Sequence, residues 1–316
     1  MIIEAMTGPT ASLPAINGVA PLPHLGVIRA EGEDAARFLH GQLTQDFVLL
    51  GPDQARLAAL CSPKGRMLAS FIGIKPTPQE VLLICQADLL AATLKRLSMF
   101  VLRAKLCLSD ASADFELHGL MGNALEKIAK ENRLTMECRD FSSGKLIFLP
   151  SAPGLERAIW IAPRGTSAPA SASLAPDLWQ WAEVQSGVAW VSAAIADQFV
   201  PQMLNYESVG GVNLKKGCYP GQEVVARSQF RGVLKRRAFI VHADAPLAAS
   251  QEVFSAADPD QPCGLVVQAA PSPTGGFDAI ASLQISAAAS PGLHAGSPDG
   301  PELTLKPLPY TLLADV

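Results

Sequence analysis

Apolar and polar positions in the first third of the chain follow two different periods. Residues 24–32 (HLGVIRAEG) have the pattern of a strand that ends in a glycine turn, whereas residues 33–46 place apolar side chains at helical spacing. Residues 55–76 contain two apolar runs around the turn formers of SPKG, which predicts a hairpin, and residues 80–85 predict another strand. A helix over 87–100, followed by a strand-like stretch, completes the series. This order of elements is typical of an α+β domain of the split-βαβ type.

The second half of the chain repeats this mixture and then changes to strands alone. Residues 119–133 predict a helix, and residues 145–150 and 157–163 predict a pair of strands. Within residues 177–190, Asp177 is a suitable N-cap for a helix that ends near Gly187. From residue 236 onward, short apolar runs alternate with proline and glycine turns, which indicates an all-β C-terminal domain.

The composition narrows the class of protein. The 316 residues leave room for two or three domains and a sizeable core. A net charge of −4 argues against a general nucleic-acid binder but allows a local basic patch. No cysteine lies in a C-x-x-C pair or near a histidine at finger-like spacing, so we expect no zinc finger or cluster-binding module. Neither a P-loop nor a dinucleotide-binding glycine pattern is present.

The sequence also predicts where the protein works. The N-terminal stretch carries Glu4 and several prolines in place of a basic start and an apolar core, so no signal peptide is expected. No window of 18 apolar residues is free of charge, so no membrane span is expected. We therefore expect a cytoplasmic protein with reduced thiols.

The stretch LKKGCYPGQEVVAR, residues 214–227, is the strongest candidate for chemistry. Cys218 lies there between a glycine and a tyrosine, and residues 215–237 contain seven lysines and arginines against the single acid Glu223. Lysine or arginine nearby lowers the pKa of a free thiol, which makes it more reactive, but a free cysteine is more commonly a small buried apolar side chain. The basic residues suit an anionic partner such as a carboxylate, phosphate or RNA backbone, or a plain solvated surface.

Within this stretch, KGCYPGQE (216–223) resembles the signature of the YgfZ family of folate-binding proteins, which are related to the T-protein (aminomethyltransferase) of the glycine cleavage system. FLHGQLTQD (38–46), CSPKGRM (61–67) and the block 198–237 match the family in the same order. The resemblance implies an α+β fold in which three domains form a ring, with split-βαβ domains and a C-terminal β-barrel. The boundaries we expect are 1–48 with about 192–235 for a discontinuous first domain, about 49–191 for the second, and 236–316 for the barrel.

The family resemblance also implies a function. It implies a protein that binds tetrahydrofolate or another reduced folate and supports assembly or repair of iron–sulfur clusters in client enzymes, including tRNA-modifying ones. Cys218 would be the essential thiol, and the rest of the motif consists of Lys216, Gly217, Tyr219, Gly221, Gln222 and Glu223. The partners would be folate and the iron–sulfur assembly proteins or client enzymes, with the chain as a monomer. No resident metal is expected, and whether Cys218 transiently meets iron, a partner thiol or the folate stays open.

The folate contacts implied by the family are Trp179, Gln202, Asn205 and Arg227. A pair of acids found in the aminomethyltransferases aligns here with Ala69-Ser70, and a glutamate that grips folate there aligns with Asn205. Because the proton-handling carboxylate is missing, we expect no classical enzyme. The alternative is a folate-dependent aminomethyltransferase or demethylase, and a third interpretation is an RNA-binding module that contacts tRNA through residues 215–237.

Other residues have less specific interpretations. Trp181 and Trp190 are expected in the core. His40 could act as a base, but a surface or capping histidine is the commoner role, and Cys61 fits a buried strand better than a cavity wall. Lys64 and Arg66 flank the SPKG turn and would add positive charge there.

Overall fold

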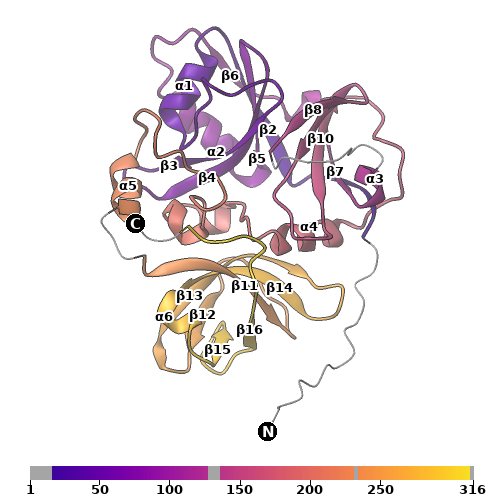
Figure 1. The fold of residues 1–316 in the computed structure, drawn as a ribbon. Coiled ribbons are helices and arrows are strands. Elements are labelled where there is room, and N and C mark those ends of the chain that lie inside the picture. Colours follow the sequence, from indigo (N-terminus) through magenta and orange to yellow (C-terminus); the bar gives the residue numbers. More distant parts are fainter. Residues whose placement is uncertain (1–15, 127–135, 231–233, 314–316) are drawn as a thin grey trace.

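The computed structural model of the chain describes residues 16–126, 136–230 and 234–313 (Figure 1). Its first sheet has the strand order β3-β4-β5-β2-β6, and every neighbouring pair is antiparallel. Strands β5 and β6 therefore run parallel to each other with β2 between them, and helix α2 connects them, which is a split-βαβ unit. The elements are β2 Leu25–Glu31, α1 Ala35–Gln42, β3 Ala55–Cys61, β4 Met67–Thr77, β5 Glu80–Gln86, α2 Ala87–Ser98 and β6 Cys107–Asp110.

The second sheet, in the order β1-β7-β10-β9-β8, is also antiparallel. The hairpin-like pair expected over 145–150 and 157–163 is present as β9 and β10. The prediction of a helix over 119–133 is wrong at its start, where residues 119–121 belong to β7, and residues 127–133 of that prediction lie outside the described part. The elements are β1 Gly18–Pro21, η1 Ser112–Asp114, β7 Phe115–Met121, α3 Asn123–Glu126, β8 Cys138–Phe141, β9 Gly144–Phe148, β10 Arg157–Pro163 and α4 Pro176–Gln185.

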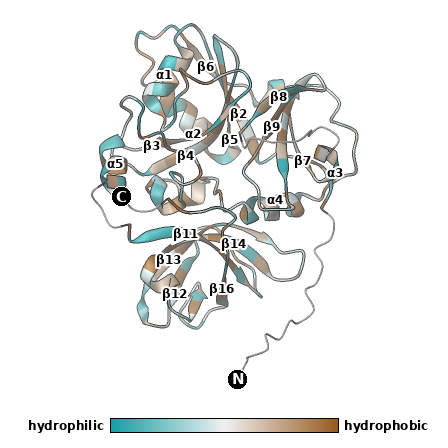
Figure 2. Cartoon of the chain, in the orientation of Figure 1, coloured by the Kyte–Doolittle hydropathy of each residue, from teal (hydrophilic) through white to brown (hydrophobic). Residues whose placement is uncertain are grey.

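The C-terminal part is a closed barrel in the order β11-β14-β13-β12-β15-β16, as the strand pattern from residue 236 indicated. Alternate side chains of its strands point inward and form a separate apolar core. The hydrophilic start of β11 stands out in Figure 2. The elements are β11 Arg236–Ala243, β12 Glu252–Ser255, β13 Asp258–Pro271, β14 Phe277–Gln284, α6 Ile285–Ala288, β15 Leu293–Ala295 and β16 Glu302–Lys306.

The expected boundary near residue 49 is wrong, because it cuts through the first sheet. Strand β2 pairs along its whole length with β5, so residues 25–110 form one unit, while β1 at residues 18–21 belongs to the second sheet. Residues 197–199 return to the first sheet and exchange backbone hydrogen bonds with Met67. The described chain thus forms β1 of the second sheet, then the first sheet, then the rest of the second sheet, before residues 197–199 return to the first.

Helix α4 lies where the three parts meet (Figure 1) and contacts β1, β13 and β14. The indole Nε1 of Trp181 donates to Asp278 Oδ2 at 2.7 Å, and the amide Nε2 of Gln185 donates to the same oxygen at 2.9 Å. Asp278 is fully buried, and Lys306 neutralises it at 2.7 Å. His242 Nδ1 of β11 also lies 2.8 Å from Asp278 Oδ1. Asp278 therefore has partners from α4, β11 and β16, which fixes the barrel to α4 and sets the position of the site described below.

Three buried thiols in the sheets make the stability of the fold depend on pH in the alkaline range. Burial raises the pKa of Cys61 and Cys85 to about 12 and that of Cys138 to about 11, from an ordinary value of 9.0. Above pH 9 the unfolded chain releases these protons while the folded chain keeps them, so each thiol's contribution to stability is lost as pH rises toward 11–12. The unfolding free energy of the wild type should fall between pH 9 and pH 10. We expect this fall to be about 1 kcal/mol smaller in Cys85→Ala, because the variant lacks one of these thiols. Urea denaturation at both pH values measures it, and an unchanged decrease would contradict it.

Candidate functional site

A cavity of about 210 Å³ lies where α4 meets the first sheet and the barrel. Its wall takes residues from all these parts: His24, Gln86, Gln180, Glu183, Trp190, Ser192, Ala248, Ala249, Val267, Gln268 and Ala269. A larger cavity of about 460 Å³ between the first and second sheets has mainly apolar walls, such as Ile74, Phe115 and Ile161. The smaller cavity is the better candidate for a specific site, because several polar groups converge in it.

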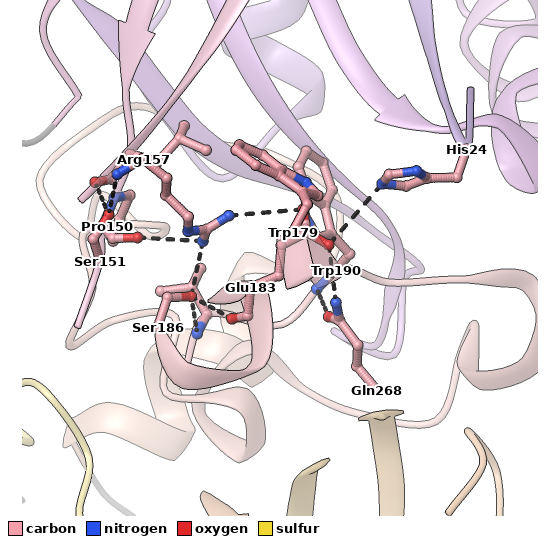
Figure 3. A network of polar contacts seen from close by, with 11 residues as sticks. His24, Pro150, Ser151, Arg157, Trp179, Glu183, Ser186, Trp190 and Gln268 are labelled. Carbon is pink, nitrogen blue, oxygen red and sulfur yellow. Dashed lines mark hydrogen bonds and ion pairs between the residues drawn. The ribbon is translucent and has the colours of Figure 1, made fainter. Parts of the chain in front are cut away.

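Glu183 on α4 is the centre of this polar network (Figure 3). Its side chain is 1% exposed, and its Oε1 accepts hydrogen bonds from the indole Nε1 atoms of Trp179 and Trp190, both at 3.1 Å. Its Oε2 accepts from Gln268 Nε2 at 3.3 Å. Two indole donors on one oxygen leave Oε2, on the side of Gln268, as the oxygen more open to a ligand.

Arg157 on β10 provides the compensating charge. Its Nη1 lies 3.7 Å from Glu183 Oε1, and its guanidinium lies 5.5 Å from the centre of the Trp179 ring. Its Nη2 donates to Ser186 Oγ at 2.9 Å and to the carbonyl of Pro150 at 3.2 Å. Burial lowers the pKa of Arg157 to about 10, and Glu183 opposes that shift. At neutral pH the two side chains therefore form a buried ion pair.

His24 completes the cavity wall with a nitrogen that lacks a partner. Its Nε2 is buried, lies 4.0 Å from Glu183 Oε2, and has no hydrogen-bond partner among the described residues. A buried polar atom without a partner is costly, so such atoms mark places where a ligand or water completes the bonding. Glu183 Oε2 and His24 Nε2 could together hold a flat heterocycle that has neighbouring N–H groups.

None of the four expected folate contacts, all of them described residues, lines this cavity. Trp179 is fully buried behind Glu183, and a Cβ on Gly119 would lie 2.3 Å from its ring. Gln202 and Asn205 are also fully buried: Gln202 Nε2 donates to the carbonyl of Val225 at 2.8 Å, and Asn205 Nδ2 to that of Ala238 at 2.8 Å. They connect the segment η3 (Pro201–Leu204) to α5 (Gln222–Phe230) and β11.

Arg227 is likewise placed away from the central cavity. It is exposed on α5 and pairs with Glu223 at 2.7 Å, one helical turn earlier. The residue that the sequence analysis missed is Glu183. Its only signal in the sequence is that WQWAEV contains a single acid. This acid lies on the buried side of α4, together with apolar residues of the helix.

The Cys218 loop lies in the chain just before α5. Cys218 is exposed, whereas Tyr219 beside it is buried. Gly221 has φ +79°, and a Cβ there would lie 2.4 Å from the carbonyl oxygen of Ser62, so the SPKG turn packs directly against this loop. Lys64 and Arg66 of that turn are exposed, which brings positive charge to the neighbourhood of the thiol.

Lys216 fastens the loop to the first sheet. It is 8% exposed, and its Nζ donates to the carbonyls of Leu43 at 3.0 Å and Gly217 at 3.2 Å. The ammonium also lies 4.6 Å from the centre of the Tyr219 ring. Burial lowers the pKa of Lys216 to about 8. The lysine is therefore an internal anchor that still carries most of its charge at neutral pH.

The basic residues of 215–237 do not form a continuous cationic face. Lys216 and Arg237 are buried, and Arg237 pairs with Glu207. Arg236 donates to the carbonyl of Cys263 at 2.9 Å. Arg231 lies outside the described residues. The strip counted from the sequence thus includes charges that serve the interior, which weakens the interpretation as an RNA-binding surface.

Comparison with known proteins identifies relatives over most of the chain. An uncharacterized protein of Haemophilus influenzae is 30% identical over 215 residues, covering 68% of this chain and 69% of the relative. The tRNA-modifying protein YgfZ of Hamiltonella defensa is 30% identical over 252 residues, covering 75% and 74%. That of Sodalis glossinidius is 26% identical over 322 residues, covering 96% and 95%. No family model matches the chain.

Among solved structures, the aminomethyltransferase T of the glycine cleavage system from Bartonella henselae superposes with a TM-score of 0.71. The match covers 94% of this chain and 87% of that one at 15% sequence identity. The fold is therefore the three-domain aminomethyltransferase fold. Within the described residues, no helix is both long and apolar enough to cross a membrane.

Proposed function

The chain belongs to the YgfZ family, and from this membership we propose that it binds a reduced folate in the cavity at Glu183 and uses the Cys218 thiol to support iron–sulfur clusters in client enzymes, tRNA-modifying ones included. The observation that carries the folate part is the buried carboxylate of Glu183, whose Oε2 meets the unpartnered Nε2 of His24 at the cavity. The thiol part rests on the exposure of Cys218 within the KGCYPGQE loop.

The chemistry of a pterin suits this cavity. The 2-amino group and the neighbouring ring N–H of a reduced pterin are adjacent donors, and a carboxylate oxygen accepts such donors well. A cavity of about 210 Å³ is smaller than the roughly 300–1,000 Å³ of most small-molecule sites. We therefore assign it to the pterin end of folate, with the aminobenzoyl-glutamate part extending outward.

The residues at 69–70 support a binding role over one-carbon transfer. Ala69 is buried, and Ser70 Oγ accepts the backbone N–H of Val191 at 2.9 Å, so this position holds the backbone in place of a proton-handling carboxylate. Glu183 Oε1 already accepts two indole N–H groups. These contacts favour a folate-binding protein over an aminomethyltransferase or demethylase.

The positions of the two sites suggest separate tasks. Cys218, a described residue, does not line the central cavity, and its exposed thiol is open to a macromolecular client. Folate in the cavity would instead contact α4 and the barrel, which Asp278 joins. We propose that folate binds between the domains of this protein, whereas Cys218 contacts the client.

A pocket-filling substitution tests the folate site without removing a buried polar group. Ala249 lies at the cavity and is partly exposed, so the larger side chain of Ala249→Trp should fill the space. We expect the affinity for tetrahydrofolate to fall by 10-fold or more, because a loss of about 1.4 kcal/mol in binding free energy gives that factor. Ala245→Trp, in the same loop but outside the cavity wall, is the matched control. Equal affinities of the two variants, measured by calorimetry, would place the ligand elsewhere.

A further inference from the structure

His40 and Asp46 form a hydrogen-bonded pair beside the Cys218 loop. His40 lies in the last turn of α1, and its Nδ1 lies 3.1 Å from Asp46 Oδ1. Burial opposes ionisation of Asp46, but hydrogen bonds from the backbone N–H of Leu49 and from His40 outweigh it and hold its pKa below the usual value. At neutral pH Asp46 is thus a carboxylate, which can only accept hydrogen bonds. Nδ1 of His40 therefore carries the hydrogen of the bond between them. A ring that carries a single hydrogen, on Nδ1, presents a lone pair at Nε2.

The Nε2 atom of His40 lies close to the residue before the cysteine. A Cβ built on Gly217 would lie 3.4 Å from His40 Nε2, so the imidazole meets the loop backbone directly next to Cys218. Glycine at 217 keeps this approach open, since any larger side chain would stand between the ring and the loop. The exposed thiol and the imidazole therefore belong to the same small region of surface.

Lys216 holds the two segments together. Its Nζ donates to the carbonyl of Leu43, which lies between His40 and Asp46 in the chain. Its charge interacts with both Asp46 and Cys218. The titratable groups at this place are thus His40 and Asp46, from α1 and the loop after it, and three groups of the other loop: Lys216, Cys218 and Tyr219. A cysteine beside an oriented histidine and a cation is the arrangement of an activated thiol.

We propose that His40, oriented by Asp46, is the proton acceptor for the Cys218 thiol. The Sγ–H proton moves to Nε2, which leaves a thiolate and an imidazolium whose Nδ1–H still donates to Asp46. The thiolate electron pair is then available to attack a soft electrophile. The inference deepens the proposed function, because it rests on Cys218 being the working thiol and adds how that thiol is prepared.

Alkylation by iodoacetamide tests the inference on the full chain. The thiolate sulfur forms a bond to the probe carbon, iodide leaves, and the proton stays on His40. Cys107 is the internal control, because it is the other exposed cysteine in the described residues. Mass spectrometry of both peptides gives the two rates at each pH from 5.5 to 8.5. We expect Cys218 to react at least about 10-fold faster than Cys107 at pH 7, and His40→Gln to remove that advantage without changing the rate at Cys107.

The pH profile separates a proton acceptor from a residue that only supports the loop. In the wild type the rate at Cys218 should rise at lower pH than the rate at Cys107, and His40→Gln should bring the two pH profiles together. Asp46→Asn should act in the same direction, with a smaller effect. An unchanged profile in a folded His40→Gln protein would overturn the inference.

The same variants keep this inference distinct from the proposed function. If Cys218→Ala loses support of iron–sulfur enzymes while His40→Gln keeps the wild-type alkylation profile, only the role of His40 is wrong. If Cys218→Ala keeps full support, the working thiol itself is wrong, and the inference falls with it.

Discussion

Replacing Cys218 by alanine is expected to abolish support of iron–sulfur enzyme activity while leaving the fold intact. The side chain is exposed, so removing its sulfur opens no cavity, and surface changes of this kind shift the unfolding free energy by no more than about 0.5 kcal/mol. The chemical effect is complete because alanine offers no nucleophile and no acidic proton. The measurement pairs the activity of an iron–sulfur client in cells that lack the native gene with urea denaturation of the purified variant.

Cys107→Ala is the matched control for that experiment, since it removes the other exposed thiol of the described residues, which lies outside the motif. It should support the client as well as the wild type does. Full support by the Cys218 variant would contradict the role assigned to this thiol. A loss of support together with a loss of stability would move the explanation from chemistry to folding.

Replacing Glu183 by alanine is expected to lower the unfolding free energy by about 3–5 kcal/mol, the usual cost of removing one partner of a buried ion pair. The change leaves the buried guanidinium of Arg157 without its counter-charge and leaves the indole N–H groups of Trp179 and Trp190 without an acceptor. Urea denaturation at pH 7 measures the effect. Glu156→Ala, at the exposed position directly before Arg157, should stay within about 0.5 kcal/mol.

A double variant identifies the cause of that loss. Arg157→Met in the Glu183→Gln background removes both charges, and replacing a buried pair by uncharged groups is often close to neutral. We therefore expect the double variant to be more stable than Glu183→Gln alone. If Glu183→Ala cost less than about 1 kcal/mol, the buried ion pair of Glu183 and Arg157 would not have the structural weight expected of it.

Local patterns in the sequence predicted most elements of the fold. The split-βαβ unit and the C-terminal strands follow from apolar periodicity and turn residues, which act over a few positions. The boundary near residue 49 was wrong because a domain limit depends on which strands pair, and β2 pairs with β5 some 50 residues later. Nothing in residues 25–31 or 80–86 taken alone indicates that partnership.

The two sites differ in the same way. Cys218 could be found from the sequence, because its motif is contiguous and its glycines and lysines lie within eight residues. Glu183 could not, since its partners His24, Arg157 and Gln268 come from three distant segments. The count of basic residues failed for a related reason: the sequence does not show that Lys216 points inward to the carbonyl of Leu43.

Calorimetric titration with tetrahydrofolate tests the central claim, a folate site at Glu183 that is separate from the thiol at Cys218. The account predicts saturable one-to-one binding to the wild type and the same affinity in Cys218→Ala, because the thiol does not line the cavity. Absence of binding to the wild type would remove folate from the account. Binding that is lost in Cys218→Ala would contradict the separation of the two sites.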